Sequence, residues 1–356
     1  MAHRRFAASV MLVAALAASP ALADPGAGLL LRWTPDPVAL AALVAMGWAY
    51  GRGAARQYRR AAELADWKPA LFYLGLFAIF LAMLSPLAAL SRESAFMHQV
   101  QGALLRVVAP VFLLCGHPQR LLYTGMPKPF RRGAFARLWR DGRLNRVAGG
   151  LATPLVAGVL NIAVFLFWLL PATQDAAVRL PLVGFVERVS LLAVGALYFG
   201  VLFDARDPDL GGTRYGPRML MLVSTALVMV VMGVAMTAKP ILFYSAYPPG
   251  PRFGGFAPLD DEATAGFVNW AWVSMVYLAS IIFVFVRWNA AELRAYARAR
   301  NFRGSNAAAL LLPETAEELW LLVTPKNRRV ALGLAFVPFI MMGSAIGLVV
   351  TLHYGF

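Results

Sequence analysis

Cysteine, histidine and charged residues are all scarce in this chain. Of its 356 residues, one is cysteine (Cys115) and four are histidine, and only 14% are charged against 60% hydrophobic. A single cysteine excludes an intramolecular disulfide and a CxxC metal site. So few charges, with a mean hydropathy of +0.64, exclude a soluble globule and indicate an integral membrane protein.

Motifs of energy-driven or hydrolytic chemistry are also missing. The sequence contains no Walker, GxGxxG or HExxH motif and no internal repeat, which argues against ATP-driven and zincin chemistry. No nucleophile or base arrangement stands out from the background either. We therefore expect a protein that is not an enzyme.

The charges that are present are mostly basic. The net charge is +15, which could suggest a nucleic-acid partner, but the basic residues form blocks between apolar runs. Such blocks are typical of topology anchors in a membrane protein. The lipid bilayer is thus the predicted environment, and nucleic acid is not a predicted partner.

The N-terminus has the pattern of a secretory signal peptide over residues 1–23. Basic residues at positions 3–5 precede a short apolar core, Phe6 to Ala18, and the small-residue pattern Ala21-Leu22-Ala23. This core is too short for a spanning helix, so cleavage before Asp24 is predicted. An uncleaved anchor is the alternative. Both deliver the following segment to the outside, which in a bacterium is the periplasm.

Apolar runs of spanning length predict an all-α, polytopic transmembrane bundle of seven to eight spans. Residues 24–288 would form a seven-helix membrane domain and residues 330–356 an additional C-terminal helix. The first run is short for a membrane span and is interrupted by Gly47 and Gly51. The runs are 37–51, 70–90, 95–116, 147–170, 184–203, 219–238, 267–288 and 330–353.

The charge bias of the loops agrees with an outside start. Loops 52–68, 117–146, 204–218 and 289–329 hold most of the basic residues, so they are predicted to be cytoplasmic. Eight spans then place the C-terminus in the periplasm of a bacterial inner membrane. Residues 289–329 are predicted to be a cytoplasmic linker, either an amphipathic surface helix anchored by Trp320 or a plain solvated segment.

Polar residues within the spans gather near the predicted outer ends. His98, Glu187, Arg188 and the acids at 260–262 would share one depth if their helices are neighbours. Imidazole and carboxylate together can bind copper or zinc; the alternative is a polar cap in which His98 is hydrogen-bonded to Glu187. Arg106 lies about 12 Å deeper on the same helix as His98, with Asn161 or helix carbonyls as expected partners.

Three methionines of the sixth run share a helical face: Met229, Met232 and Met236. Thioethers are ligands for Cu(I), so this face could be a copper path. Core packing is the alternative and the commoner role of a methionine stripe.

Five stretches together resemble the CtaG family of cytochrome c oxidase assembly factors, the multi-spanning type associated with caa3 oxidases. They lie in order between Trp33 and Trp288 and leave the last predicted span outside the resemblance. The stretches are "SAFMHQVQGALLRVVAPVFLLCGHP", "TPLVAGVLNIAVFLFWLLPATQDAAV", "PLVGFVERVSLLAVGALYFGVL", "KPILFYSAY" and "LDDEATAGFVNWAWVSMVYLASIIFVFVRW".

The resemblance also implies a set of histidines that this chain largely lacks. His98 matches the first histidine of the family's third-span pattern, and Glu187 and Asp261 match family acids. Four other positions where the family pattern has histidine are occupied by different residues: Gly102, Leu169, Gly184 and Arg188. The resemblance therefore implies copper as a cofactor, but this chain lacks four of the histidines that would bind it.

The resemblance implies a non-enzymatic role in assembling a haem-copper cytochrome c oxidase, with oxidase subunits or copper chaperones as partners. The metal site would be degraded or altered, with His98, Glu187 and Asp261 as its remaining candidate ligands. Arg188 is the expected charge partner of Glu187 or Asp261. The rival hypothesis is a transporter or permease for copper or another small solute, using the three methionines and the Arg106 and Asn161 pair.

Overall fold

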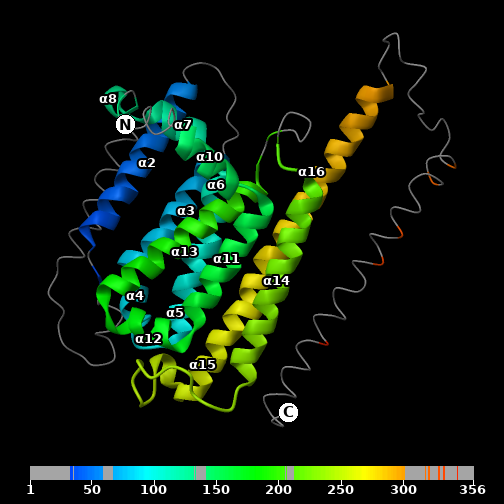
Figure 1. Cartoon of the computed structure of the whole chain (residues 1–356). Helices are drawn as coiled ribbons and strands as arrows, with labels where there is room; N and C mark the ends of the chain where they lie inside the picture. Colours follow the sequence, from blue (N-terminus) through cyan, green and yellow to red (C-terminus); the bar gives the residue numbers. More distant parts are fainter. Residues whose placement is uncertain are drawn as a thin grey trace.

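The computed structural model is a bundle of long helices that run between two ends (Figure 1). It describes residues 33–34, 36–58, 67–131, 133, 142–204, 206 and 212–300, together with the single residues 317, 320, 328, 332 and 343. Over these ranges the chain is helical and contains no strand. The predicted signal peptide at 1–23 and most of the predicted C-terminal helix at 330–356 lie outside the described residues.

Six described helices are long and apolar enough to cross a membrane, and a bent pair brings the number to as many as seven. The all-α, membrane-spanning prediction is thus confirmed. The eighth predicted span, 330–353, lies outside the described residues. The six are α2 (Pro37–Tyr58), α3 (Trp67–Leu84), α5 to α6 (Ala95–Cys115), α13 (Pro181–Leu202), α14 (Tyr215–Ala238) and α15 to α16 (Pro258–Tyr296).

The bent pair covers the apolar run 147–170, which predicts one membrane span. α10 (Gly142–Leu151) and α11 (Pro154–Leu169) meet at an angle of 74°. Pro154 is the first residue of α11, and a proline can begin a helix but cannot continue one from the preceding turn. Proline begins α12 (Pro171–Arg179), α13 and α15 (Pro258–Phe267) in the same way.

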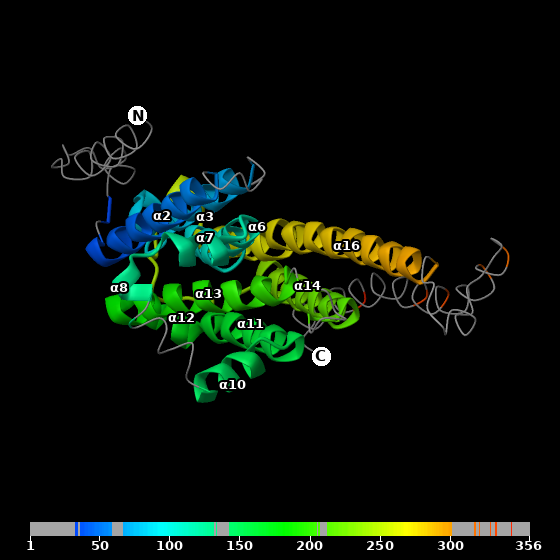
Figure 2. The same ribbon diagram turned by 90° about the horizontal axis from the view of Figure 1, so that it is seen from above.

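Short helices and loops close the two ends of the bundle. One end carries α4 (Pro86–Leu90), the first turn of α5 (Ala95–Ala103), α12 and the loop 239–257; we call it the His98 end, at the bottom of Figure 1. The opposite end carries α7 (Pro118–Gly125) and α8 (Lys128–Phe130). Near it, α16 (Ser274–Arg300) extends beyond its neighbours in both ribbon views (Figure 2), and passes residue 288 without a break.

Two π-helical turns interrupt long helices inside the bundle. η1 (Leu104–Val108) joins α5 to α6 (Ala109–Cys115), and η5 (Val268–Val273) joins α15 to α16. A π-helical turn inserts one residue into an α-helix and frequently occurs at functional sites. The space between the interrupted helix α5–α6 and the interrupted helix α15–α16 is therefore a candidate location for a functional site.

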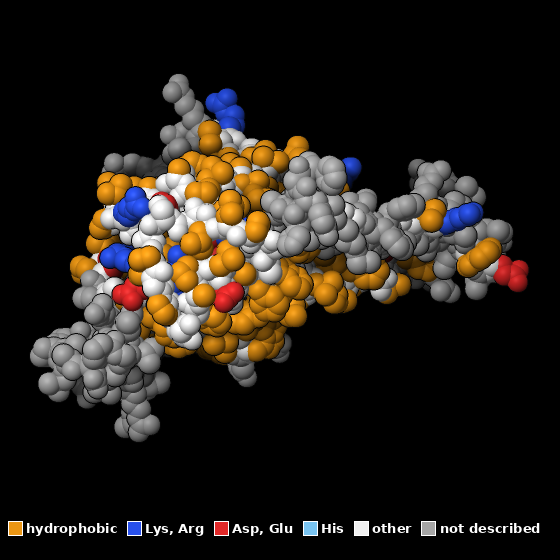
Figure 3. Space-filling view, turned by 90° about the horizontal axis from the view of Figure 1, so that it is seen from below, with side chains coloured by type: hydrophobic (Ala, Val, Ile, Leu, Met, Phe, Trp, Pro, Cys, Tyr) orange, Lys and Arg blue, Asp and Glu red, His pale blue; other side chains and the backbone are white. Residues whose placement is uncertain are grey.

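The outer surface of the bundle is apolar, as a protein surrounded by hydrocarbon requires. Leu155, Leu182 and Leu220 are more than 70% exposed. Viewed onto the His98 end, charged and polar side chains gather on the end face, whereas hydrophobic side chains cover the flanks (Figure 3). The polar residues predicted near this end therefore lie where the bundle leaves its apolar surroundings.

Candidate functional site: a polar cluster at the His98 end

His98 and Glu187 form a buried pair between α5 and α13. His98 Nε2 lies 2.8 Å from Glu187 Oε1, and His98 Nδ1 lies 3.2 Å from the carbonyl oxygen of Ser91. The predicted hydrogen bond between His98 and Glu187 is therefore present, as expected for the polar cap. Both ring nitrogens are engaged, which leaves neither lone pair open to a metal ion in this arrangement.

Both imidazole nitrogens of His98 face oxygen atoms. A doubly protonated ring has one N–H donor for each of these oxygens. In that form His98 and Glu187 are an ion pair.

Asp261 holds the N-terminus of α5 from the neighbouring helix α15. Its Oδ2 accepts from the backbone N–H of Ala95 at 2.7 Å, and its Oδ1 accepts from the Ser94 hydroxyl at 2.5 Å. A longer bond of 3.4 Å comes from the N–H of Phe96. Because an anion at a helix N-terminus satisfies unpaired N–H groups and the helix dipole, Asp261 acts as a cap supplied by another helix.

The charge partner of Asp261 is Arg252 rather than Arg188. Arg252 Nη1 lies 3.0 Å from Asp261 Oδ2. Glu187 pairs with His98, so in the described part of the chain Arg188 forms an ion pair with neither carboxylate. The loop 239–257 brings Arg252 onto α15, which a pattern of helical spacing could not reveal.

Glu262 fixes the same loop at a second point. Lys239 donates to Glu262 Oε2, and the backbone N–H groups of Phe243 and Tyr244 donate to the same carboxylate at 2.9 and 3.2 Å. Burial lowers the pKa of Lys239, whereas the hydrogen bond and charge of Glu262 act in the opposite direction. The two acids at 261 and 262 thus each join a helix to the loop that closes the His98 end.

An amide network extends from this cluster toward the bundle interior. Gln99 Oε1 accepts from Asn269 at 3.0 Å, while Gln99 Nε2 donates to Gln174 at 3.4 Å. Gln174 in turn donates to the Tyr247 hydroxyl at 2.9 Å. Burial raises the pKa of Tyr247 well above its usual range, so its hydroxyl stays protonated.

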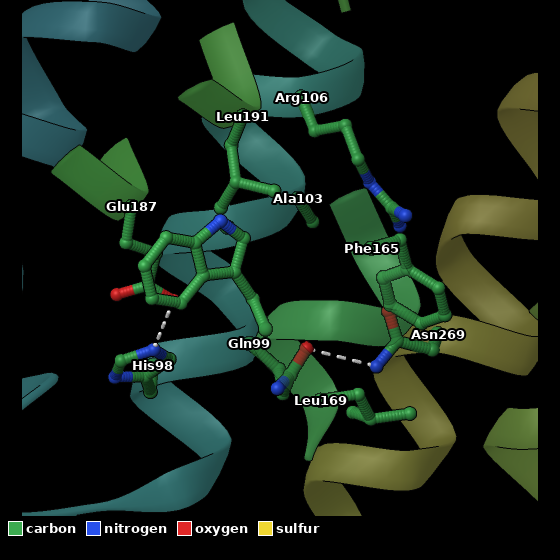
Figure 4. Close-up of a pocket in the computed structure, with 11 residues that line it drawn as sticks. His98, Gln99, Ala103, Arg106, Phe165, Leu169, Glu187, Leu191 and Asn269 are labelled. Carbon is green, nitrogen blue, oxygen red and sulfur yellow. Dashed lines mark hydrogen bonds and ion pairs between the residues drawn. The ribbon is translucent and has the colours of Figure 1, made fainter. Parts of the chain in front are cut away.

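A small cavity lies where these groups meet η1 and η5 (Figure 4). Its volume is about 20 Å³, enough for roughly one water molecule. Gly102 and Leu169, two positions where the CtaG resemblance implies histidine, share its wall with His98 and Glu187. The lining residues are His98, Gln99, Gly102, Ala103, Arg106, Phe165, Trp168, Leu169, Glu187, Leu191 and Asn269.

Two predictions from the sequence concern a metal: a ligand cluster around His98, and a copper path along Met229, Met232 and Met236. Across the described ranges, no group of three or more His, Cys, Asp or Glu side chains is placed to hold a metal ion. Met229 and Met236 are buried in the core, and Met232 packs against it. These contacts agree with the packing role of the methionine face.

Arg106 has a different partner from the two that were expected. Its Nη2 lies 3.3 Å from Met229 Sδ, and its guanidinium carbon lies 4.0 Å from the centre of the Phe165 ring. Asn161 instead accepts from the Tyr277 hydroxyl at 3.5 Å. The π-helical turn that carries Arg106 changes the helical register, which the sequence does not signal.

Sequence reasoning missed several residues that hold the cluster together. Ser94 could have been found, since serine just before an apolar helical run is a capping signal. Arg252 and Lys239 had no such signal, because each lies in a loop rich in proline and glycine or at its edge. Their role depends on how that loop folds back onto α15.

Comparison with known proteins gives one family match. The model of the family described as cytochrome c oxidase caa3 assembly factor (Caa3_CtaG) matches residues 48–291, a range that runs from α2 into α16. Neither curated proteins nor solved structures give a match.

Proposed function

Because the chain belongs to the Caa3_CtaG family of cytochrome c oxidase caa3 assembly factors, we propose that it assists the assembly of a haem-copper oxidase in a bacterial inner membrane. Its partners in this proposal are oxidase subunits or copper-delivery proteins. The supporting observation is the length of the family match, which includes nearly all of the described bundle. The charge bias of the loops supports a periplasmic His98 end and C-terminus.

The cavity supports a further part of the proposal, namely that the metal site is degraded. His98 and Glu187 line it, but glycine and leucine occupy the two neighbouring positions at 102 and 169. A copper site needs several soft or imidazole ligands. With both nitrogens of His98 already hydrogen-bonded, the residues present do not fit copper, and contact with partner proteins becomes the proposed mode of action.

The transporter hypothesis receives less support from the same geometry. Transporters place a substrate site near the bilayer midplane, often beside broken helices. The bend at Pro154 and the two π-helical turns are breaks of this general kind. The bend lies at the opposite end of α11 from the cavity, and the cavity has a volume of only about 20 Å³. We therefore retain assembly as the proposed function.

Assembly is tested by removing the gene and measuring the oxidase. We expect the mutant membranes to lose the absorbance of assembled oxidase haem and the associated oxygen consumption, and we expect the full-length gene to restore both. Normal oxidase in the deletion strain would refute the proposal. If the oxidase is lost in the deletion strain, cross-linking from the loop 239–257 would identify the oxidase subunit in contact.

Metal content tests the second part separately. The purified protein, loaded with Cu(I) under reducing conditions, is compared with the His98→Ala variant. We expect no stoichiometric copper in either protein. Stoichiometric copper that is lost in His98→Ala would show that the site is intact with other ligands, and would overturn the degraded-site proposal while leaving the assembly role in place.

A further inference from the structure

Arg106 is a permanent positive charge inside the bundle, and its surroundings do not neutralise it. The side chain is 2% exposed, and its close contacts are the thioether of Met229 and the ring face of Phe165. Within the described residues, the atom Nη1 has no hydrogen-bond partner. An unpaired buried cation is costly in a protein interior and more so in hydrocarbon.

Five acids of the described residues form ion pairs with groups other than Arg106. These pairs join His98 to Glu187, Lys239 and Arg252 to Asp261 and Glu262 of α15, and two arginines to Asp175 and Asp204. Glu187 shares the cavity with Arg106, but its ion-pair partner is His98. Within the described residues, no carboxylate forms an ion pair with Arg106.

The shape of the cavity limits what could supply the missing negative charge. It is bounded by Arg106 of η1 and Asn269 of η5, so two π-helical turns shape it. A volume of about 20 Å³ holds about one particle of the size of water. Carboxylates, phosphates and larger cofactors are too large, whereas a monatomic anion is of the right order.

We propose that this cavity is an anion site in which Arg106 Nη1 donates to one halide ion, chloride under physiological conditions. The anion neutralises the guanidinium and satisfies its unpaired N–H groups, since charge-assisted hydrogen bonds of this kind are the strong ones. Met229 and Phe165 hold the guanidinium plane from two other directions. The site is distinct in chemistry from a copper site, which requires the opposite charge.

Thermal unfolding of the purified full-length protein in detergent tests this site. Sodium chloride replaces sodium gluconate at constant ionic strength, because gluconate is too large for the cavity. A ligand that binds only the folded state raises Tm in a saturable manner. We expect such a rise with chloride and with bromide, and its loss in Arg106→Met.

The matched control is Arg179→Met, which removes an arginine whose side chain is 58% exposed and pairs with Asp175. This variant should keep the full chloride dependence. Equal Tm values of the wild-type protein in chloride and gluconate would overturn the proposal, as would a chloride dependence that persists in Arg106→Met.

A second measurement decides the question if Arg106→Met does not fold. Bromide-soaked crystals of the wild-type protein give an anomalous signal at any bound bromide. A peak beside Arg106 Nη1 supports the site, and a cavity without one, or filled by water alone, refutes it.

Discussion

Replacing Asp261 by alanine removes the carboxylate that joins α15 to the start of α5 and to Arg252. The carboxylate is fully buried and accepts from Ser94, Ala95 and Arg252 within 3.0 Å. Removing one partner of a buried ion pair costs about 3 to 5 kcal/mol, because the other charge stays buried. Loss of the cap adds about 1 kcal/mol, so a loss of about 4 kcal/mol or more is expected.

The assay is the free energy of unfolding in mixed detergent micelles, with Asp260→Ala as the matched control. Asp260 is the preceding acid in the same helical turn, but it is exposed, so its loss should cost about 1 kcal/mol or less through the helix dipole. Asp261→Asn should give an intermediate loss, because an amide oxygen can still accept from the N-terminus of α5.

Two results would refute this reasoning. A loss in Asp261→Ala no larger than that in Asp260→Ala would show that the cap and the ion pair contribute little. A loss that occurs only in copper-loaded protein would mean that Asp261 acts as a metal ligand. The double variant with Arg252→Met separates the pair from the cap, since the coupling free energy isolates the interaction between the two side chains.

Two further predictions concern close packing and the cavity. Gly125→Ala should destabilise the protein by about 1 to 3 kcal/mol, because its Cβ would overlap the carbonyl oxygen of Ala49. Gly216→Ala is the control in the same unfolding assay, since its Cβ would meet no described atom within 4 Å. Equal losses of stability in the two variants would contradict the argument. The double variant Gly102→His, Leu169→His should gain Cu(I) in metal analysis relative to wild type, since both positions line the cavity with His98; unchanged copper content would show that the cavity cannot be returned to a metal site by ligands alone.

The spans were predictable because hydrocarbon imposes a strong rule on sequence. Backbone groups in lipid must pair within a helix, so long apolar runs identify helices directly. The bend before Pro154 was the exception in the bundle. The proline itself was visible, but its angle depends on how α10 and α11 pack, which a run of apolar residues does not encode.

The sequence predicted only those contacts of the candidate site that depend on how far each residue lies from the end of its helix. His98 and Glu187 lie near the same ends of their helices, and the structure pairs them. Arg252 lies in a loop without periodicity, so its contact with Asp261 depends on the tertiary path of the chain. The π-helical turns η1 and η5 could not be predicted either, since each depends on packing between helices and has no residue signature in this sequence.

The electrostatics of the cavity links the two proposals about it. His98 is the ion-pair partner of Glu187, which leaves Arg106 as the unpaired charge among the residues that line the cavity. An unpaired positive charge attracts an anion and repels a copper ion. The absence of histidine at 102 and 169 and the unpaired charge of Arg106 therefore both disfavour copper binding in the cavity. With glycine at 102 and leucine at 169, these two positions provide no imidazole ligands whose bonds to a metal could exceed this repulsion. The arginine that a copper site would tolerate poorly is the same group that an anion site requires.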